Sequence, residues 1–88
     1  MASNNIIYGM FTQKGHVSEV KPSVEEEPRM MRQMSFRPEG LNHDTTVLIE
    51  CDMASSLVFE VRMWIDVRKQ GELYFATNFG YELDAIND

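Results

Sequence analysis

The sequence predicts a single all-β, or nearly all-β, domain over 1–88, with five or six antiparallel strands in a meander that curls into a small barrel or roll. Two observations lead to this fold class. Apolar and polar residues alternate through most of 46–83, which is the pattern of strands with one buried face. The chain has 88 residues, of which 43% are apolar, and this is enough for one small core.

The N-terminal half is expected to begin with two strands joined by a tight turn. The segments 6–12 and 16–20 are rich in residues that favour strands, and the sequence Gln-Lys-Gly at 13–15 is typical of a turn. Gly9 interrupts the first strand, which indicates a bulge or the close approach of another backbone. Residues 1–5, and 84–88 at the other end, are expected to be loose.

The middle of the chain allows two interpretations. Residues 21–28 form a connector that is bounded by Pro22 and Pro28. Residues 29–36 alternate like a strand, which is the preferred interpretation. A short helix near 28–34 is a close second, because a proline preceded by acids can begin a helix and three methionines fall at helical spacing. In the alternative α+β fold, this helix would lie across the sheet.

The C-terminal half predicts three successive strands at 46–53, 59–68 and 72–83. Their loops are expected at 54–58 and 69–71, and Gly71 would supply the positive φ that the second loop needs. In the preferred registers Leu48 lies opposite Trp64, and Ile65 lies opposite Phe75. Val61, Ile65 and Phe75 would then face the interior, whereas Trp64 would face outward.

The outward face of these strands is the best functional clue in the sequence. It would carry a small apolar patch centred on tryptophan with a charged rim, and Trp, Tyr and Arg dominate binding hot spots. An equally weighted alternative is that the N-terminal hairpin covers this patch. The candidate protein-binding residues are Leu48, Arg62, Trp64, Asp66 and Tyr74.

The charge balance argues against two classes of partner. Fourteen acidic and eight basic residues give a net charge of -6, which repels phosphate backbones and anionic membranes. We therefore expect no direct nucleic-acid binding and no membrane partner. The run Glu25, Glu26 and Glu27 is a candidate acidic patch. It leaves open an acidic mimic of nucleic acid that inhibits a basic protein.

No pattern of catalytic, metal or cofactor residues is present. His16, His43 and Cys51 lack a recognised metal spacing, and a single cysteine forms no intrachain disulfide. The chain begins without the basic and apolar segments of a secretory signal, and its apolar runs are too short to cross a bilayer. We expect a cytoplasmic protein without enzymatic activity, cofactor or metal.

The sequence thus favours a non-enzymatic protein-binding or accessory module. It is expected to self-associate, as a homodimer or a higher oligomer, through the exposed aromatic patch. The alternatives are the acidic inhibitor and, less favoured, a small-molecule binder or enzyme.

Overall fold

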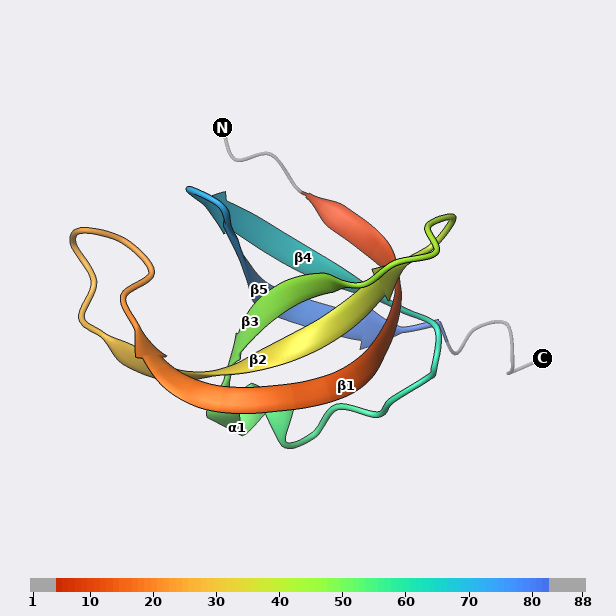
Figure 1. The fold of residues 1–88 in the computed structure, drawn as a ribbon, viewed down its shortest axis with the longest axis horizontal. Helices are drawn as coiled ribbons and strands as arrows, with labels where there is room; N and C mark the ends of the chain where they lie inside the picture. The colour runs from red at the N-terminus through yellow and green to blue at the C-terminus, as the bar shows by residue number, and fades with distance from the viewer. Residues whose placement is uncertain (1–4, 83–88) are drawn as a thin grey trace.

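The computed structural model describes residues 5–82, and its main feature is one sheet of five strands that closes on itself in a ring (Figure 1). Around the ring the order is β1-β2-β3-β5-β4, and β4 pairs again with β1. The predicted all-β class is confirmed. The predicted meander is wrong, because β5 rather than β4 lies next to β3. The elements are β1 (Ile6–Val20), β2 (Arg29–Pro38), β3 (Thr45–Glu50), α1 (Cys51–Ala54), β4 (Met63–Gln70) and β5 (Leu73–Tyr81).

Strand β1 replaces the two N-terminal strands that the sequence predicts. It runs for 15 residues without a turn, and two register shifts, one of them between Lys14 and Val17, bend it around the ring. Its start pairs with β4 over 6–9, and the rest pairs with β2 over 9–20. At the crossing, a Cβ on Gly9 would lie 2.2 Å from the Arg37 carbonyl oxygen. The close backbone approach expected at Gly9 is confirmed.

Strand β2 lies between β1 and β3 and is paired with both. The strand interpretation of 29–36 is therefore confirmed, and the alternative helix near 28–34, lying across the sheet, is wrong. Met34 and Phe36 face the interior and are almost fully buried. The strands on both sides of β2 form hydrogen bonds with its extended backbone. These bonds favour the strand over the helix that the spacing of its methionines would allow.

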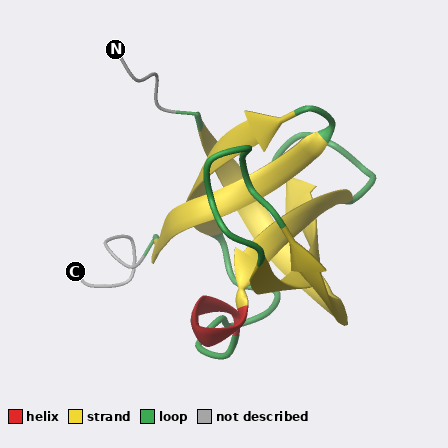
Figure 2. Ribbon diagram, turned by 90° about the vertical axis from the view of Figure 1, so that its left-hand side faces the viewer, coloured by secondary structure: helices red, strands yellow, loops and turns green. Residues whose placement is uncertain are grey.

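The predicted hairpin between 46–53 and 59–68 is wrong. β3 ends at Glu50, and the following residues form the short helix α1 at one end of the ring (Figure 2). Ala54 and Leu57 enter the core there, which an outer hairpin loop would not allow. β3 instead pairs with β2 in antiparallel and with β5 in parallel orientation. Within residues 5–82, no helix has the length and apolar character needed to cross a membrane.

The hairpin between β4 and β5 exists, but its register differs from the prediction. The turn has two residues, Gly71 and Glu72, because Gln70 already pairs with Leu73. Gly71 has a φ of +64°, as its turn position requires. The pairing skips one residue of β5 between Asp66 and Val67. Side chains of β5 before and after this point therefore do not follow the single alternation that the sequence suggests. Phe75, predicted to face the interior of the ring, therefore lies on the outer face of the sheet, where a second apolar cluster buries it.

The main core fills the inside of the ring. Phe11 and Phe36 pack edge to face there, with ring centroids 4.9 Å apart. The inward position predicted for Ile65 is confirmed, whereas Val61 lies in the loop before β4 and is only partly buried. The fully or nearly fully buried members are Phe11, Met34, Phe36, Val47, Ile49, Ala54, Met63, Ile65 and Val67.

A second, smaller apolar cluster lies outside the ring, next to the short parallel pairing of β3 and β5. It contains Met31, Leu48 and Phe75, with Val20 packed against it. The connector 21–28 folds back beside this cluster, and its Pro22 is fully buried. A sheet that is enclosed on its inner face thus also has apolar cover on part of its outer face.

The predicted loose ends, 1–5 and 84–88, lie outside the described residues with the exception of Asn5. The Asn5 carbonyl accepts a hydrogen bond from the Val67 N–H at 3.1 Å. The chain is therefore attached to β4 one residue before β1 begins.

Replacing Gly9 with alanine should destabilise the protein by about 1–3 kcal/mol, because the added methyl group meets backbone on one side and the Phe36 ring on the other. Urea unfolding measures this loss. Gly15→Ala is the matched control within β1, since its added Cβ would lie 3.1 Å from the nearest atom. If the two variants lost equal free energy of unfolding, the close contact at Gly9 would not be a special steric constraint.

Candidate functional site

Two aromatic residues stand side by side on the outer surface where β1 meets β4. Tyr8 of β1 pairs directly with Trp64 of β4, and Trp64 pairs with Gly80 of β5 on its other side. Met63 and Ile65, which flank Trp64 in β4, point into the core and are 0% exposed. The alternation of the strand therefore turns Trp64 outward, as the sequence predicts. We call Tyr8 and Trp64 the aromatic platform.

The indole of Trp64 lies against the backbone of β5. A Cβ on Gly80 would come within 2.5 Å of Cζ2, 2.6 Å of Cε2 and 2.7 Å of Nε1 of the indole. Only a glycine leaves room for the ring at this point, so one side of the indole rests on Gly80. Trp64 is half-buried, and Tyr8 beside it is 41% exposed. The indole is thus supported by β5 on one side, and both rings of the platform remain at least partly exposed to solvent.

Arg62 forms one end of the platform. Its guanidinium carbon lies 5.2 Å from the centre of the Tyr8 ring, a cation–π distance. Its Nε and Nη2 donate to the two Glu39 carboxylate oxygens at 2.8 and 3.0 Å, and its Nη1 donates to Glu82. The hydrogen bond with Glu39 is the largest cause that raises the pKa of Arg62. The same bond lowers the pKa of Glu39.

Asp66 forms the other end of the platform. It is the next outward residue of β4 beyond Trp64, and it is half-buried. Within residues 5–82 its carboxylate forms no ion pair, in contrast to Glu39 and Glu82. The platform therefore lies between a guanidinium with carboxylate partners and a carboxylate that has no ion-pair partner within residues 5–82.

An apolar hollow of about 200 Å³ opens on the other side of Arg62. Most of its lining is apolar, and Leu41 in the loop after β2 is 48% exposed beside it. Arg62 and Glu39 thus separate the hollow from the platform. The lining residues are Gly9, Met10, Arg37, Pro38, Glu39, Gly40, Leu41 and Arg62.

The structure brings together three of the five candidate protein-binding residues. Trp64 and Asp66 are alternate residues of β4, and Arg62 lies just before that strand, two residues from Trp64. Leu48 lies in the outer cluster and is 3% exposed. Tyr74 lies in β5 opposite Lys69, whose Nζ is 5.7 Å from the centre of its ring. Leu48 was assigned to the patch through a strand pairing that does not form, and Tyr74 through a register of the β4–β5 hairpin that differs from the observed one.

Tyr8 is the surface residue that sequence reasoning missed. Its position in a strand was predicted, but nothing in the local pattern indicates that β1 pairs with β4. The alternative in which the N-terminal strands cover the patch is also wrong, because β1 extends the sheet next to Trp64 and does not lie over it.

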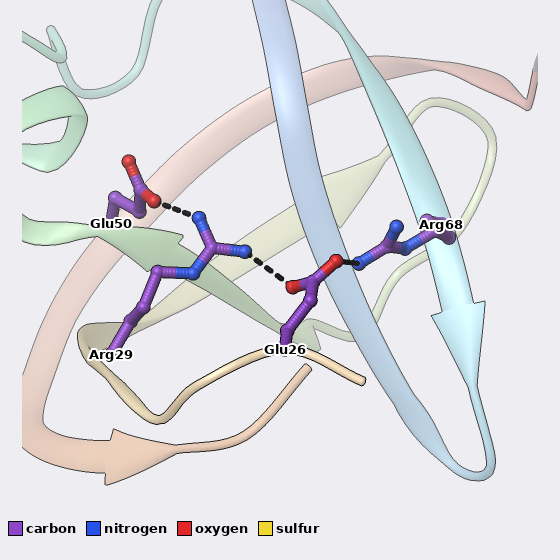
Figure 3. A network of polar contacts seen from close by, with 4 residues as sticks. All are labelled: Glu26, Arg29, Glu50 and Arg68. Atoms are coloured by element: carbon purple, nitrogen blue, oxygen red, sulfur yellow. Dashed lines mark hydrogen bonds and ion pairs between the residues drawn. The ribbon is translucent and has the colours of Figure 1, made fainter. Parts of the chain in front are cut away.

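The acidic run divides between two environments. Glu25 and Glu27 are exposed, whereas Glu26 is bound to two arginines (Figure 3). Its oxygens lie 2.8 Å from Arg29 Nη2 and 3.6 Å from Arg68 Nη2. Arg29 also donates to Glu50 at the end of β3, and this hydrogen bond is the largest cause that raises the pKa of Arg29. The chain of ion pairs ties the connector to β2, β3 and β4.

The histidines and the cysteine are dispersed. His16 is exposed in β1, and His43 is exposed in the loop before β3. Cys51 is half-buried in α1, not inward on a strand as predicted, and lines an open hollow with Met30 and Asp52. In the part of the chain that the structure describes, no three His, Cys, Asp or Glu side chains are grouped as a metal site would require.

Comparison with protein-family models, with curated proteins and with solved structures finds no significant match for this chain. Any functional conclusion therefore depends on the geometry described above.

Replacing Gly80 with alanine should displace the indole, because the new methyl group would occupy the space of its ring. Since Trp64 is the only tryptophan of the chain, intrinsic fluorescence measures the displacement as a shift in emission. Gly15→Ala, which lies away from the platform, should leave the emission unchanged. An unshifted Gly80→Ala spectrum would contradict the close contact of the indole with β5.

Two carboxylates should make the folded protein sensitive to acid. Glu39 and Asp44 have pKa values below their ordinary ones, for Asp44 mainly because the Thr12 hydroxyl donates to it at 2.6 Å and Arg37 donates at 2.8 Å. Their contribution is complete above the ordinary pKa values of about 4, and is lost as the pH falls through the lowered folded values. Urea midpoints measured from neutral to acidic pH should fall accordingly.

The variant Asp44→Asn should reduce the fall of the urea midpoint at acidic pH, because it removes one of the titrating groups. Asp52→Asn on the exposed surface of α1 is the control and should keep the wild-type slope. A slope that is unchanged in Asp44→Asn would rule out the proposed linkage.

Proposed function

We propose that this protein is a non-enzymatic protein-binding module whose contact surface is the aromatic platform together with the adjacent apolar hollow. The observation that supports this most strongly is the direct pairing of an exposed Tyr8 with a half-buried Trp64 on the outer face of the sheet. Aromatic residues beside a hollow and inside a polar rim have the composition of protein-binding hot spots.

The platform is also preorganised, which favours binding. Gly80 supports the indole from one side, and Glu39 holds the Arg62 guanidinium through two hydrogen bonds. Side chains that are already fixed lose little rotamer freedom when a partner docks. More of the contact energy is then available for affinity.

The charge distribution supports a protein rather than a nucleic acid as the partner. Small five-stranded barrels can bind oligonucleotides on the surface of their second and third strands. Here the connector before β2 carries three glutamates, and its Glu26 is paired with Arg29 at the start of β2. Among the described residues, four of the five arginines are paired with carboxylates, and Arg32 donates to the Gly15 carbonyl. Four of the eight basic side chains are thus already paired with carboxylates, which weakens the cationic surface that phosphates require.

The acidic inhibitor is the second candidate function. It would use exposed carboxylates in place of phosphates, and Glu25 and Glu27 are available for this role. Glu26 is occupied by Arg29 and Arg68, which reduces the row to two separated charges. Binding that depends on Glu25 and Glu27 and weakens steeply with salt would favour this candidate over the platform.

The test uses peptides selected from a random library against the wild-type protein. Tyr8→Ala and Trp64→Ala should each weaken their binding by about tenfold or more, as expected for hot-spot residues. Tyr74→Ala is the matched control, because it removes a half-buried tyrosine of β5 that pairs with Lys69, away from the platform. Equal binding by all three variants would refute the platform as the contact surface.

The same variants should remain folded. Trp64→Ala should cost less than Ile65→Ala, for which we expect about 2–5 kcal/mol, because Ile65 is in the core and Trp64 is outside it. Urea unfolding compares the two variants. Unfolding of Trp64→Ala would show that the indole is part of the structural core and remove the support for the proposal.

A further inference from the structure

We infer that the partner segment seated on the platform is cationic, with a basic side chain stacked over Trp64 beside Asp66 and an apolar side chain in the hollow beyond Arg62. This inference rests on the proposed function and specifies the chemistry of the partner. It also distinguishes an unlike partner from a second copy of this chain.

The charges around the platform favour a cation. Glu39, Glu82 and Asp66 carry three negative charges there against one positive charge on Arg62. Arg37, at the edge of the hollow, is paired with Asp44 at 2.8 Å and adds no free charge. The surface is therefore net negative, like the whole chain at -6. A second copy would bring the same negative surface into contact, whereas a basic segment is complementary.

The geometry gives the basic side chain a specific place. Asp66 follows Trp64 by two residues on the same side of β4, which is roughly 7 Å along a strand. A guanidinium or ammonium group over the open side of the indole would have Asp66 as its counter-ion. On the other side of Trp64, Arg62 already makes this kind of contact with Tyr8 at 5.2 Å. Cation stacking thus fits the ring surface that Trp64 leaves open.

The hollow provides the second recognition element. Met10, Pro38 and Leu41 contribute apolar lining, and its volume of about 200 Å³ accommodates an aliphatic side chain. Because Arg62 and Glu39 lie between the hollow and the platform, both elements contact neighbouring residues of one extended segment. A segment that combines leucine with arginine therefore satisfies both.

The experiment follows Trp64 emission during titration with short synthetic Gly-Ser peptides. One peptide carries leucine and arginine, a second replaces arginine with the neutral isostere citrulline, and a third replaces it with glutamate. We expect saturable binding of the arginine peptide, about tenfold weaker binding of the other two, and a loss of affinity as salt is added. Asp66→Asn should weaken the arginine peptide about threefold to tenfold, and the control Asp52→Asn should not.

Equal binding of the arginine and citrulline peptides, or equal effects of Asp66→Asn and Asp52→Asn, would overturn the inference. A second overturning result is an emission change that follows protein concentration together with a rise in mass by native mass spectrometry, because a second copy would then occupy the platform. In that case the proposed function stands and only the cationic partner is wrong. If no peptide of this set binds and the protein stays monomeric, the inference fails, whereas the proposed function is decided separately by the library-selected peptides.

Discussion

Strand β1 pairs with β4 up to Gly9 and with β2 from Gly9 onward, and the remaining architecture depends on this crossing. At Gly9 the Arg37 carbonyl and the Phe36 ring come too close to leave space for any side chain. The crossing closes the ring, so the inner face of every strand can contribute to one core. It also places Tyr8 next to Trp64, although the two residues are far apart in the chain. Both the fold and the candidate surface thus require a residue without a side chain at position 9.

The pairing of β3 with β5 is the shortest in the ring, with Val47 opposite Tyr74 and Leu48 opposite Phe75. Two features of the outer surface reinforce it. The cluster of Met31, Leu48 and Phe75 is buried there, and Glu26 connects the covering connector to Arg29 and Arg68. Exposed ion pairs contribute little individually, so burial of the apolar cluster supplies most of the stabilisation. The ion pairs instead hold the connector in position.

The candidate surface combines an apolar centre with an unequal distribution of charge. Arg62 is held between Glu39 and the Tyr8 ring, and its positive charge is balanced by a carboxylate of the same chain. Asp66 at the opposite end is half-buried and has no ion-pair partner among the described residues. Trp64 lies between them on a strand whose alternate residues form the core. A rigid aromatic surface with one available carboxylate discriminates between partners by charge, because apolar contact alone would be less selective.

The sequence by itself determined the extended character of most of the chain, although not of 51–53 or 59–62, and, within β4, which side chains turn inward. Alternation has a period of two residues along a strand, so Ile65 and Trp64 could be assigned to opposite faces without knowledge of the neighbours. The positive φ of Gly71 followed from turn chemistry in the same way. Arg62, Trp64 and Asp66 of the candidate site were therefore accessible to sequence reasoning.

Only the tertiary structure decided which strands are neighbours. The parallel pairing of β3 with β5 and the return of β1 to β4 join segments far apart in the chain, and a local pattern carries no information about such partners. The register shift between Asp66 and Val67 moved Phe75 to the outer surface, and Ala54 and Leu57 entered the core from a segment predicted as an outer loop. Tyr8 joined Trp64 for the same reason: the pairing of β1 with β4 closes the ring around one apolar core, and the choice of closing strands is a property of the whole chain.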